Sequence, residues 1–388
     1  MQELRRGGGV LKKLGITGKV GRWIASFLQG RSQQVMVKEH LSTPSCLRAG
    51  VPQGSVIGPL LFLVFIGDID EGVLAKVLVY VDDSKVMDKV ESEEDVIKLQ
   101  ENLDKIYTWE VENNMKFNPG KFQLLRYGRN TDLKENTIYF TGGMSSVIEQ
   151  TNCTKDLGVM MEDTANFSVQ IEKVCKKVRQ KCGWIMRTFY SRNPAFLRHM
   201  WNTYVQPHID YCSQLWSPSE GAELQKIEKL LQSFTAQIPA VKQLNYWDRL
   251  KELRMNSEQR RLERYKIIYA WKVLECKAPN CGLECEDSER NGRSIKVRPL
   301  KKQVTKLRGD SFQEIGPKLF NCLPKKIRNL TKIEVDDFKE ALDDFLSGIP
   351  DQPKAPGLTP AAMSATAEHS NSLLHQVALT ARQRARGS

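Results

Sequence analysis

Residues 76–83 constrain the fold of this chain most, because an apolar, β-branched run ends in two adjacent acids. Val77-Leu78-Val79-Tyr80 comes before Val81-Asp82-Asp83, and the polar pair Ser84-Lys85 follows. This order predicts a β-hairpin with arms at residues 76–80 and 84–89. The turn would hold two carboxylates at its tip, and carboxylate oxygens are ligands that Mg²⁺ takes beside substrate phosphates. A solvated turn without a ligand is the alternative interpretation.

A second motif precedes the hairpin. Pro52-Gln53-Gly54 leads through Gly58 into an apolar segment at residues 60–66. Gly54 and Gly58 allow close backbone approach, as a loop lying against a nucleotide or template requires. An ordinary loop before a core helix fits the same residues. The two motifs in this order, about 30 residues apart, are more specific together than either is alone.

The rest of the first 160 residues mixes helix and strand patterns. Residues 11–28 look helical, although glycines interrupt them, and residues 33–38 alternate as a strand. Apolar residues recur at three- and four-residue spacing from Val96 to Trp109, which predicts a helix that packs under a sheet. Strands are expected at residues 121–127 and 136–140. The fold class is therefore α+β, with an antiparallel sheet and helices followed by a mostly helical region.

A basic helix begins the second half. Residues 173–198 hold eight Lys or Arg and no acid, and the aromatic residues Trp184, Phe189, Tyr190 and Phe196 lie among them. Cations interleaved with aromatic rings are typical of a surface that follows a phosphate backbone. A solvated basic face over an aromatic core is an equally good interpretation, and one helix can be both.

Composition limits the class of partner and the compartment. The formal net charge of +12 favours an anionic partner, with nucleic acid the leading candidate. The nine cysteines show no paired spacing, so we expect reduced thiols in an intracellular protein of the nucleus and cytoplasm. Cys276, Cys281 and Cys285 lack a nearby fourth ligand and are a poor zinc site. No apolar run approaches the ~20 residues of a spanning helix, so no membrane partner is expected.

The C-terminal part is basic and then of low complexity. Residues 290–308 form a second acid-free stretch, which would contact template or act as a flexible connector. Short helices are expected at residues 312–320 and 335–346. Prolines, alanines and serines follow Pro350 and predict a disordered tail over residues 351–388, with a weak basic patch at residues 382–386.

Taken together, these motifs resemble the reverse transcriptase of LINE-type (non-LTR) retrotransposons of the jockey-like group. The resemblance covers nearly the whole chain. Its polymerase motifs are the specific part, and the later segments identify the group and not a chemistry. The matching segments are residues 14–18, 23–28, 49–62, 80–83, 118–121, 155–159, 205–211, 216–218, 317–321 and 349–353.

The resemblance implies a role for each matching residue. Asp82 and Asp83 would be catalytic and would ligate Mg²⁺, of which the family uses two ions. Lys121 would lie near the leaving pyrophosphate. The segment departs mildly from the family, with Val81 for a common Ala and Phe122 for a common Cys. The pocket for nucleotide and template would include Pro52, Gln53, Gly54 and Tyr80; the primer grip would include Leu157 and Gly158; and the contacts to the nucleic-acid backbone would come from Lys173, Lys176, Lys177, Arg179, Lys181 and Arg187.

One expected feature is missing. The family's first metal-binding aspartate lies upstream of the segment that begins here at Leu14, where Glu3 is the one carboxylate among thirteen residues. The fingers subdomain should also lie there. We therefore expect an N-terminally truncated enzyme with half a metal cage, since a two-metal mechanism needs carboxylates on both sides of the ions.

These interpretations give four expected regions and three competing functions. The regions are a partial palm at residues 1–160, a thumb-like helical region at 161–275, a basic region at 276–350 and the tail. The first function is RNA-templated DNA synthesis, with an RNA template, a DNA primer and deoxynucleoside triphosphates as partners. The second is a non-catalytic remnant that still binds nucleic acid. The third is a relic without a biochemical role, whose incomplete sheet would expose apolar edges.

Overall fold

The computed structural model describes residues 11–12, 14–47, 49–128, 137–143, 145–218, 221–279, 283, 297, 311–352 and 371–386. The chain divides into two compact units, Met1–Thr151 (the first unit) and Asn152–Ser388 (the second unit). The expected boundary after residue 160 differs from this division, because one β-hairpin, residues 153–162, lies in the second unit. Most of the basic stretch at 290–308, together with Cys281 and Cys285, lies outside the described residues.

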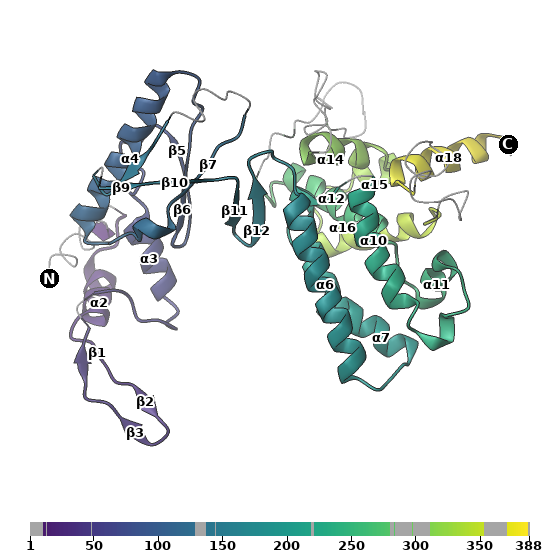
Figure 1. Ribbon diagram of the computed structural model, residues 1–388, viewed down its shortest axis with the longest axis horizontal. Coiled ribbons are helices and arrows are strands. Elements are labelled where there is room, and N and C mark those ends of the chain that lie inside the picture. Colours follow the sequence, from purple (N-terminus) through teal and green to yellow (C-terminus); the bar gives the residue numbers. More distant parts are fainter. Residues whose placement is uncertain are drawn as a thin grey trace. The chain divides into compact units, whose positions relative to one another are not determined.

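In its described residues, the first unit combines helices with short strands (Figure 1). Its helices are α2 (Gly18–Leu28), α3 (Gly58–Ile66) and α4 (Glu93–Asn113), with a 3₁₀ turn, η1 (Pro119–Lys121). Its strands are β1 (Ser32–Gln33), β2 (Met36–Val37), β3 (His40–Leu41), β4 (Ser45–Cys46), β5 (Lys76–Tyr80), β6 (Asp83–Met87), β7 (Gln123–Leu125), β8 (Phe140–Thr141), β9 (Ser146–Val147) and β10 (Glu149–Thr151).

The strands of the first unit form separate pairs. Antiparallel pairs join β1 with β4, β2 with β3, β5 with β6 and β8 with β9, while β7 pairs with β10 in parallel. The expected antiparallel sheet is thus built from two-stranded pieces in the described residues. The strand expected from residue 121 begins only at Gln123, because Asn118 first closes the 3₁₀ turn by accepting a hydrogen bond from the Gly120 amide.

Helix α4 covers the small core of the first unit. It begins with a capping box in which Ser92 and Asp95 bond each other's backbone amides, and it ends at Asn114 in the left-handed conformation. Ile106 and Trp109 on its inner face pack against Ile66 and Ile69, and Val77 and Val86 of the β5–β6 hairpin join them. The expected apolar stripe is confirmed at Ile106 and Trp109, which are buried.

The described residues of the second unit form a hairpin followed mostly by helices. The hairpin consists of β11 (Cys153–Asp156) and β12 (Val159–Glu162). The helices are α6 (Ser168–Thr188), α7 (Pro194–Met200), the π-helical turn η2 (Trp201–Val205), α8 (Gln206–Asp210), α9 (Ser213–Trp216), α10 (Ala222–Thr235), the 3₁₀ turn η3 (Pro239–Val241), α11 (Tyr246–Leu253), α12 (Glu258–Leu274), α14 (Phe312–Asn321), α15 (Lys325–Arg328), α16 (Val335–Ser347) and α18 (Leu373–Arg386). Among the described helices, none is both long and apolar enough to cross a membrane.

Two apolar clusters hold the second unit together. The first joins α6 to α7, α8, α10 and α11 around the fully buried Trp201. The second lies between α12, α14 and α16, where Trp271 stacks on Phe338 with ring centroids 4.4 Å apart. The short helices expected at residues 312–320 and 335–346 are confirmed, and the structure adds that both pack into this second cluster.

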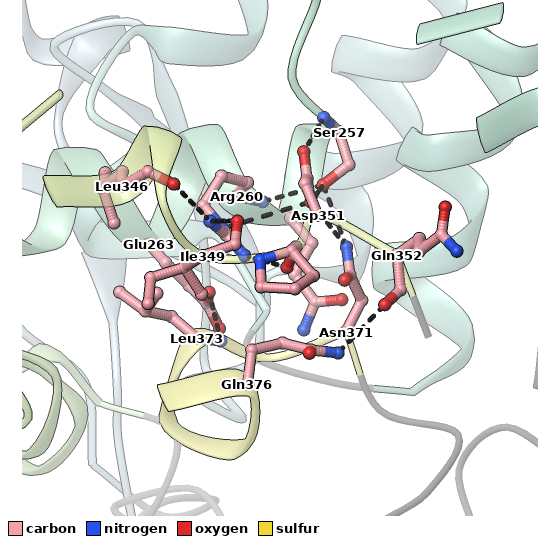
Figure 2. A network of polar contacts seen from close by, with 12 residues as sticks. Ser257, Arg260, Glu263, Leu346, Ile349, Asp351, Gln352, Asn371, Leu373 and Gln376 are labelled. Carbon is pink, nitrogen blue, oxygen red and sulfur yellow. Dashed lines mark hydrogen bonds and ion pairs between the residues drawn. The ribbon is translucent and has the colours of Figure 1, made fainter. Parts of the chain in front are cut away.

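A polar network fastens the C-terminal segment to the start of α12 (Figure 2). Asp351 accepts hydrogen bonds from the amide and the hydroxyl of Ser257, both at 2.7 Å. The buried Arg260 donates to the carbonyls of Leu346, Ile349 and Pro350. This network gives the described part of the matching segment, residues 349–352, a structural role.

Part of the segment expected to be a tail forms helix α18. Leu373 donates its amide to the Glu263 carboxylate at 2.8 Å, and Gln376 donates to the carbonyl of Gln352 at 3.0 Å. These contacts fix the first turn of α18 against α12 (Figure 2). Residues 371–386, which the sequence assigns to the tail, thus contain a helix whose first turn is bonded to Glu263 and to Gln352.

Candidate metal and nucleic-acid sites

The two acids lie at the tip of the β5–β6 hairpin. Tyr80 pairs with Asp83, so Val81 and Asp82 alone form the turn. Paired residues of a hairpin share a face, which places Tyr80 and Asp83 side by side, while Val77 and Val86 contact the core. Asp82, Asp83 and Tyr80 are all exposed. The sequence prediction of a hairpin presenting two adjacent carboxylates is confirmed, although its second arm starts one residue earlier than expected.

The turn has an unusual backbone. Val81 has a φ of 56°, which is a true outlier for a β-branched residue. A two-residue turn with positive φ at its first central position normally has glycine there. The strained valine limits the connection to two residues, so Asp82 lies in the turn and Asp83 begins the second arm, paired with Tyr80.

The donor set fits one side of a magnesium site. Two neighbouring carboxylates on an exposed turn offer hard oxygen ligands with room for water and phosphate. Over the residues that the structure describes, no group of three or more His, Cys, Asp or Glu is placed to hold an ion. Asp82 and Asp83 thus offer two neighbouring carboxylates, and in the described residues they are not part of a larger group of such side chains.

Hydrogen bonds between its own residues hold the Pro52–Gly58 loop in shape. The Ser55 hydroxyl donates to the Pro52 carbonyl at 2.7 Å and accepts from the Gly58 amide at 3.0 Å. A Cβ on Gly58 would lie 2.7 Å from that hydroxyl and 2.8 Å from the Pro52 carbonyl, so Gly58 serves internal packing and not an approaching ligand. Gly54 has a φ of +78° with open space around it, and Gln53 is exposed beside it.

Lys121 lies at the end of η1 and is exposed. The next residue, Phe122, makes an edge contact with Phe117 at 6.1 Å, and Phe117 stacks on Trp109 at 6.4 Å. The segment carrying Lys121 and the hairpin carrying Asp82 thus rest on the same small core of the first unit.

The Leu157–Gly158 turn joins β11 to β12 in the second unit. Both residues have positive φ, at 42° and 92°, as a tight hairpin turn requires. Two side chains fix the turn: the Tyr211 hydroxyl donates to the Leu157 carbonyl at 2.6 Å, and the Lys173 ammonium donates to the Gly158 carbonyl at 3.1 Å. Sequence analysis did not single out Tyr211, although it lies in a segment that the resemblance marked.

Helix α6 presents its cations to solvent. Its inner face buries Ile171, Val174, Val178 and Ile185. Lys181 is half-buried and lies over the Trp184 ring, 5.5 Å from its centroid. The sequence prediction of a basic, amphipathic helix is confirmed, and the exposed cations are Lys173, Lys176, Lys177, Arg179 and Arg187.

The two flanks of α6 differ. Toward α10, Arg179 lines a cavity of about 610 Å³ together with Lys226 and Lys229. Lys226 forms an ion pair with Glu223 at 2.9 Å, which offsets part of the positive charge there. Toward α8, burial and the nearby charges of Lys177 and Lys181 lower the pKa of His208. Sequence analysis did not assign His208 a role.

Comparison with known proteins agrees with this geometry. Residues 9–161 match the family model described as "Reverse transcriptase (RNA-dependent DNA polymerase)". The matched segment contains the Pro52–Gly58 loop, the β5–β6 hairpin, Lys121 and the Leu157–Gly158 turn.

Several curated relatives are named as RNA-directed DNA polymerases of mobile elements. The chain is 29% identical to the RNA-directed DNA polymerase from mobile element jockey of Drosophila funebris, over 53% of this chain and 24% of that protein. It is 28% identical to the Drosophila melanogaster jockey polymerase, over 55% and 24%, respectively. It is 26% identical to the probable RNA-directed DNA polymerase from transposon X-element of Drosophila melanogaster, over 53% and 23%. The chain thus spans about a quarter of the length of the curated relatives it matches.

Proposed function

We propose that this chain, whose residues 9–161 belong to a jockey-like reverse transcriptase, contributes Asp82 and Asp83 to RNA-templated DNA synthesis. The observation that carries this proposal is the strained two-residue turn that presents both carboxylates at an exposed tip. A turn that served only to connect two strands would have no need of a β-branched residue at positive φ.

Reverse transcriptases generally use divalent metal ions, and the proposed ligands here are the carboxylate oxygens of Asp82 and Asp83. A bound Mg²⁺ would supply positive charge against the charge that develops on the reacting phosphate. Lys121 is proposed to donate a hydrogen bond or a proton to the leaving pyrophosphate. Gln53, Gly54 and Tyr80 are proposed to line the pocket for the nucleotide and the template.

In the second unit, helix α6 is proposed to contact the phosphate backbone of the template and primer. Its exposed cations follow one another along a helix with no acid between residues 173 and 188. Such contacts are independent of sequence and weaken as salt rises. The Leu157–Gly158 turn is proposed to position the primer end, since Lys173 ties it to the start of this basic face.

Primer extension on an RNA template with Mg²⁺ tests the catalytic role in the full chain. We expect extension by the wild type and its loss in Asp82→Asn and in Asp83→Asn. Asp88→Asn is the matched control, because Asp88 directly follows β6 at the other end of the same hairpin. Failure of the wild type to extend, or extension that survives both substitutions, would contradict the proposal.

Metal binding gives a second measurement that does not depend on turnover. Titration with Mn²⁺, followed by the electron paramagnetic resonance of the free ion, should show a site that Asp82→Asn weakens and Asp88→Asn leaves unchanged. Equal Mn²⁺ binding by all three proteins would contradict the assignment of Asp82 as a ligand.

A further inference from the structure

Cations and rings gather along the α8-facing flank of α6. Lys173, Lys177 and Lys181 follow one another at four-residue spacing, and Trp184 lies three residues beyond Lys181. Residues three and four apart on a helix share a face, so these side chains form one row. The row starts beside the Leu157–Gly158 turn, where Lys173 donates to the Gly158 carbonyl.

The turn η2 and helix α8 extend this row. Tyr204 meets Trp184 edge to face, with centroids 5.4 Å apart, and the two rings are 39% and 37% exposed. Within the described part of the chain, neither the Trp184 indole N–H nor the Tyr204 hydroxyl forms a hydrogen bond. Aromatic rings that serve only the core are usually more deeply buried, as Trp201 is in this unit.

The backbone beneath Tyr204 is also unusual. Residues 201–205 form a π-helical turn in which the Gln206 amide bonds the Trp201 carbonyl. Such turns are rare and occur often at functional sites. Here the buried Gln206 side chain accepts a hydrogen bond from the Trp201 indole at 2.7 Å and holds the turn, while Tyr204 faces outward.

The electrostatics of this flank favour an anion. His208 lies close enough to Lys177 and Lys181 for their charges to lower its pKa, although burial is the larger cause. The acid on α8, Asp210, is bound to Arg261, Tyr265 and Gln206. The flank toward α10 differs, because Glu223 pairs with Lys226 there and Phe234 is buried.

We propose that the strip formed by Lys177, Lys181, Trp184, Tyr204 and His208 binds unpaired nucleic acid, with a base stacked on Trp184 and the adjoining phosphates on the lysines. Stacking on aromatic side chains tolerates any base, and a cationic groove follows the backbone. In the free protein Lys181 lies over the Trp184 ring. A bound strand would place a base on this ring and a phosphate on the Lys181 ammonium.

This inference rests on the proposed function, since it names the form of nucleic acid that the basic helix binds. The inference goes beyond the proposed contact of α6 with a phosphate backbone, because binding to the backbone of a duplex requires no exposed aromatic rings. A strip that reads only phosphates would bind a strand without bases equally well.

The test uses the full chain and a fluorescein-labelled oligouridine, with a strand of abasic residues as the second probe. Anisotropy should show that Trp184→Ala weakens oligouridine binding about tenfold, as expected for the loss of one stacked base. Trp184→Phe should retain most of the affinity, because it keeps a ring. On the abasic strand, wild type and Trp184→Ala should bind equally.

Two control variants separate stacking from charge and from folding. Trp23→Ala removes a ring of the first unit that is 56% exposed and should leave the affinity unchanged. Lys181→Ala should weaken both probes and flatten the salt dependence, whereas Lys229→Ala on the other flank should change oligouridine binding less. Each variant's melting temperature shows whether it is folded.

The outcomes are distinct from those of the proposed function. Equal oligouridine binding by folded Trp184→Ala and wild type would overturn the inference, as would an equal loss on the abasic strand. Lysine-dependent binding of a primer–template duplex in that case would leave the proposed role of α6 in place. Lys181→Ala could weaken the binding of both probes while Trp184→Ala weakens neither. The strip would then bind the phosphate backbone without stacking on a base, and the inference would be wrong.

Discussion

The two units of this chain differ in how completely they bury their apolar side chains. In the first unit the described core around the hairpin consists of Ile66, Ile69, Ile106 and Trp109 with partly buried neighbours. Large apolar residues stay outside it, among them Val56 at 97% and Leu74 at 87% exposure. In the second unit Trp201, Trp216 and Trp271 are fully buried, and two apolar clusters span its helices.

This difference separates the two proposed roles. The candidate metal ligands rest on a thin core, whereas the basic helix α6 rests on a dense one. Stability within a protein follows such local burial, so the first unit should open more readily than the second. Exposed apolar side chains on a unit proposed to hold a metal and a nucleotide also indicate a surface that a partner or a substrate could cover.

The largest expected effect comes from removing a ring of the dense core. Trp271→Ala deletes the ring stacked on Phe338 and the hydrogen bond from its indole to the Leu330 carbonyl at 2.7 Å. It should lower the free energy of unfolding of the second unit by about 3–5 kcal/mol. Urea denaturation followed by hydrogen exchange of each unit measures this.

Trp109→Ala is the matched change in the first unit, where the indole donates to Asp68 at 2.8 Å. It should abolish exchange protection of α4 and of the β5–β6 hairpin while that of α12 is retained. Loss of protection in both units from either substitution would show that the chain unfolds as one body. This result would contradict the separate stabilities of the two units.

The next effect tests the C-terminal network. Arg260 is 2% exposed and donates hydrogen bonds to three backbone carbonyls. Arg260→Met should cost the second unit about 3 kcal/mol, because the carbonyls of the C-terminal segment lose a buried charged donor. Protection of α18 in hydrogen exchange should disappear first.

Arg264→Met is the control, since its partner Asp343 is half exposed. This substitution should cost at most about 1 kcal/mol. Equal losses for the two arginines would contradict a special role for the buried network.

The third effect is the dependence of stability on pH, which should distinguish the two units without any substitution. Burial and the charge of Glu228 raise the pKa of Glu258 to about 8, and burial raises the pKa of Glu228 and of Glu263 to about 7. In the unfolded chain these carboxyls have a pKa of 4.5. Between pH 4.5 and the raised pKa values of the folded state, the folded chain therefore binds more protons than the unfolded chain. Stability should therefore fall as pH rises from about 5 to 8, by a few kcal/mol in the second unit.

Thermal melts across this pH range measure the effect. Glu258→Gln should flatten the dependence, because the amide stays neutral at every pH. A second unit whose stability rises over the same range would show that these carboxyls are ionised in the folded chain.

The smallest effect concerns the Pro52–Gly58 loop. Gly58→Ala introduces a Cβ at 2.7 Å from Ser55 Oγ and 2.8 Å from the Pro52 carbonyl oxygen. It should cost the first unit about 1–2 kcal/mol. Gly120→Ala, whose Cβ would have only an ordinary neighbour at 3.4 Å, should change the melting temperature little. A neutral Gly58→Ala would show that the loop rearranges freely.

Sequence and structure agreed best where a pattern depends on near neighbours. The β5–β6 hairpin, the stripe on α4 and the basic face of α6 follow from alternation and helical spacing, which local geometry imposes. Helix α18 did not follow from a local pattern, because its first turn is bonded to Glu263 and to Gln352, which are 110 and 24 residues away in the chain. The role of Gly58 was misread, since the reason for this glycine is a contact with Ser55.

The sequence by itself determined that two acids follow a strand, that a basic helix with aromatic residues comes later, and that both belong to a polymerase-like order of motifs. The tertiary structure alone decided that Val81 bears the strain of the turn, that Tyr211 and Lys173 fix the Leu157–Gly158 turn, and that Tyr204 meets Trp184 over a π-helical turn. The physical reason is that hydrogen bonds and ring contacts between distant residues leave no periodic trace in a sequence, whereas the burial of one face of a helix or strand does.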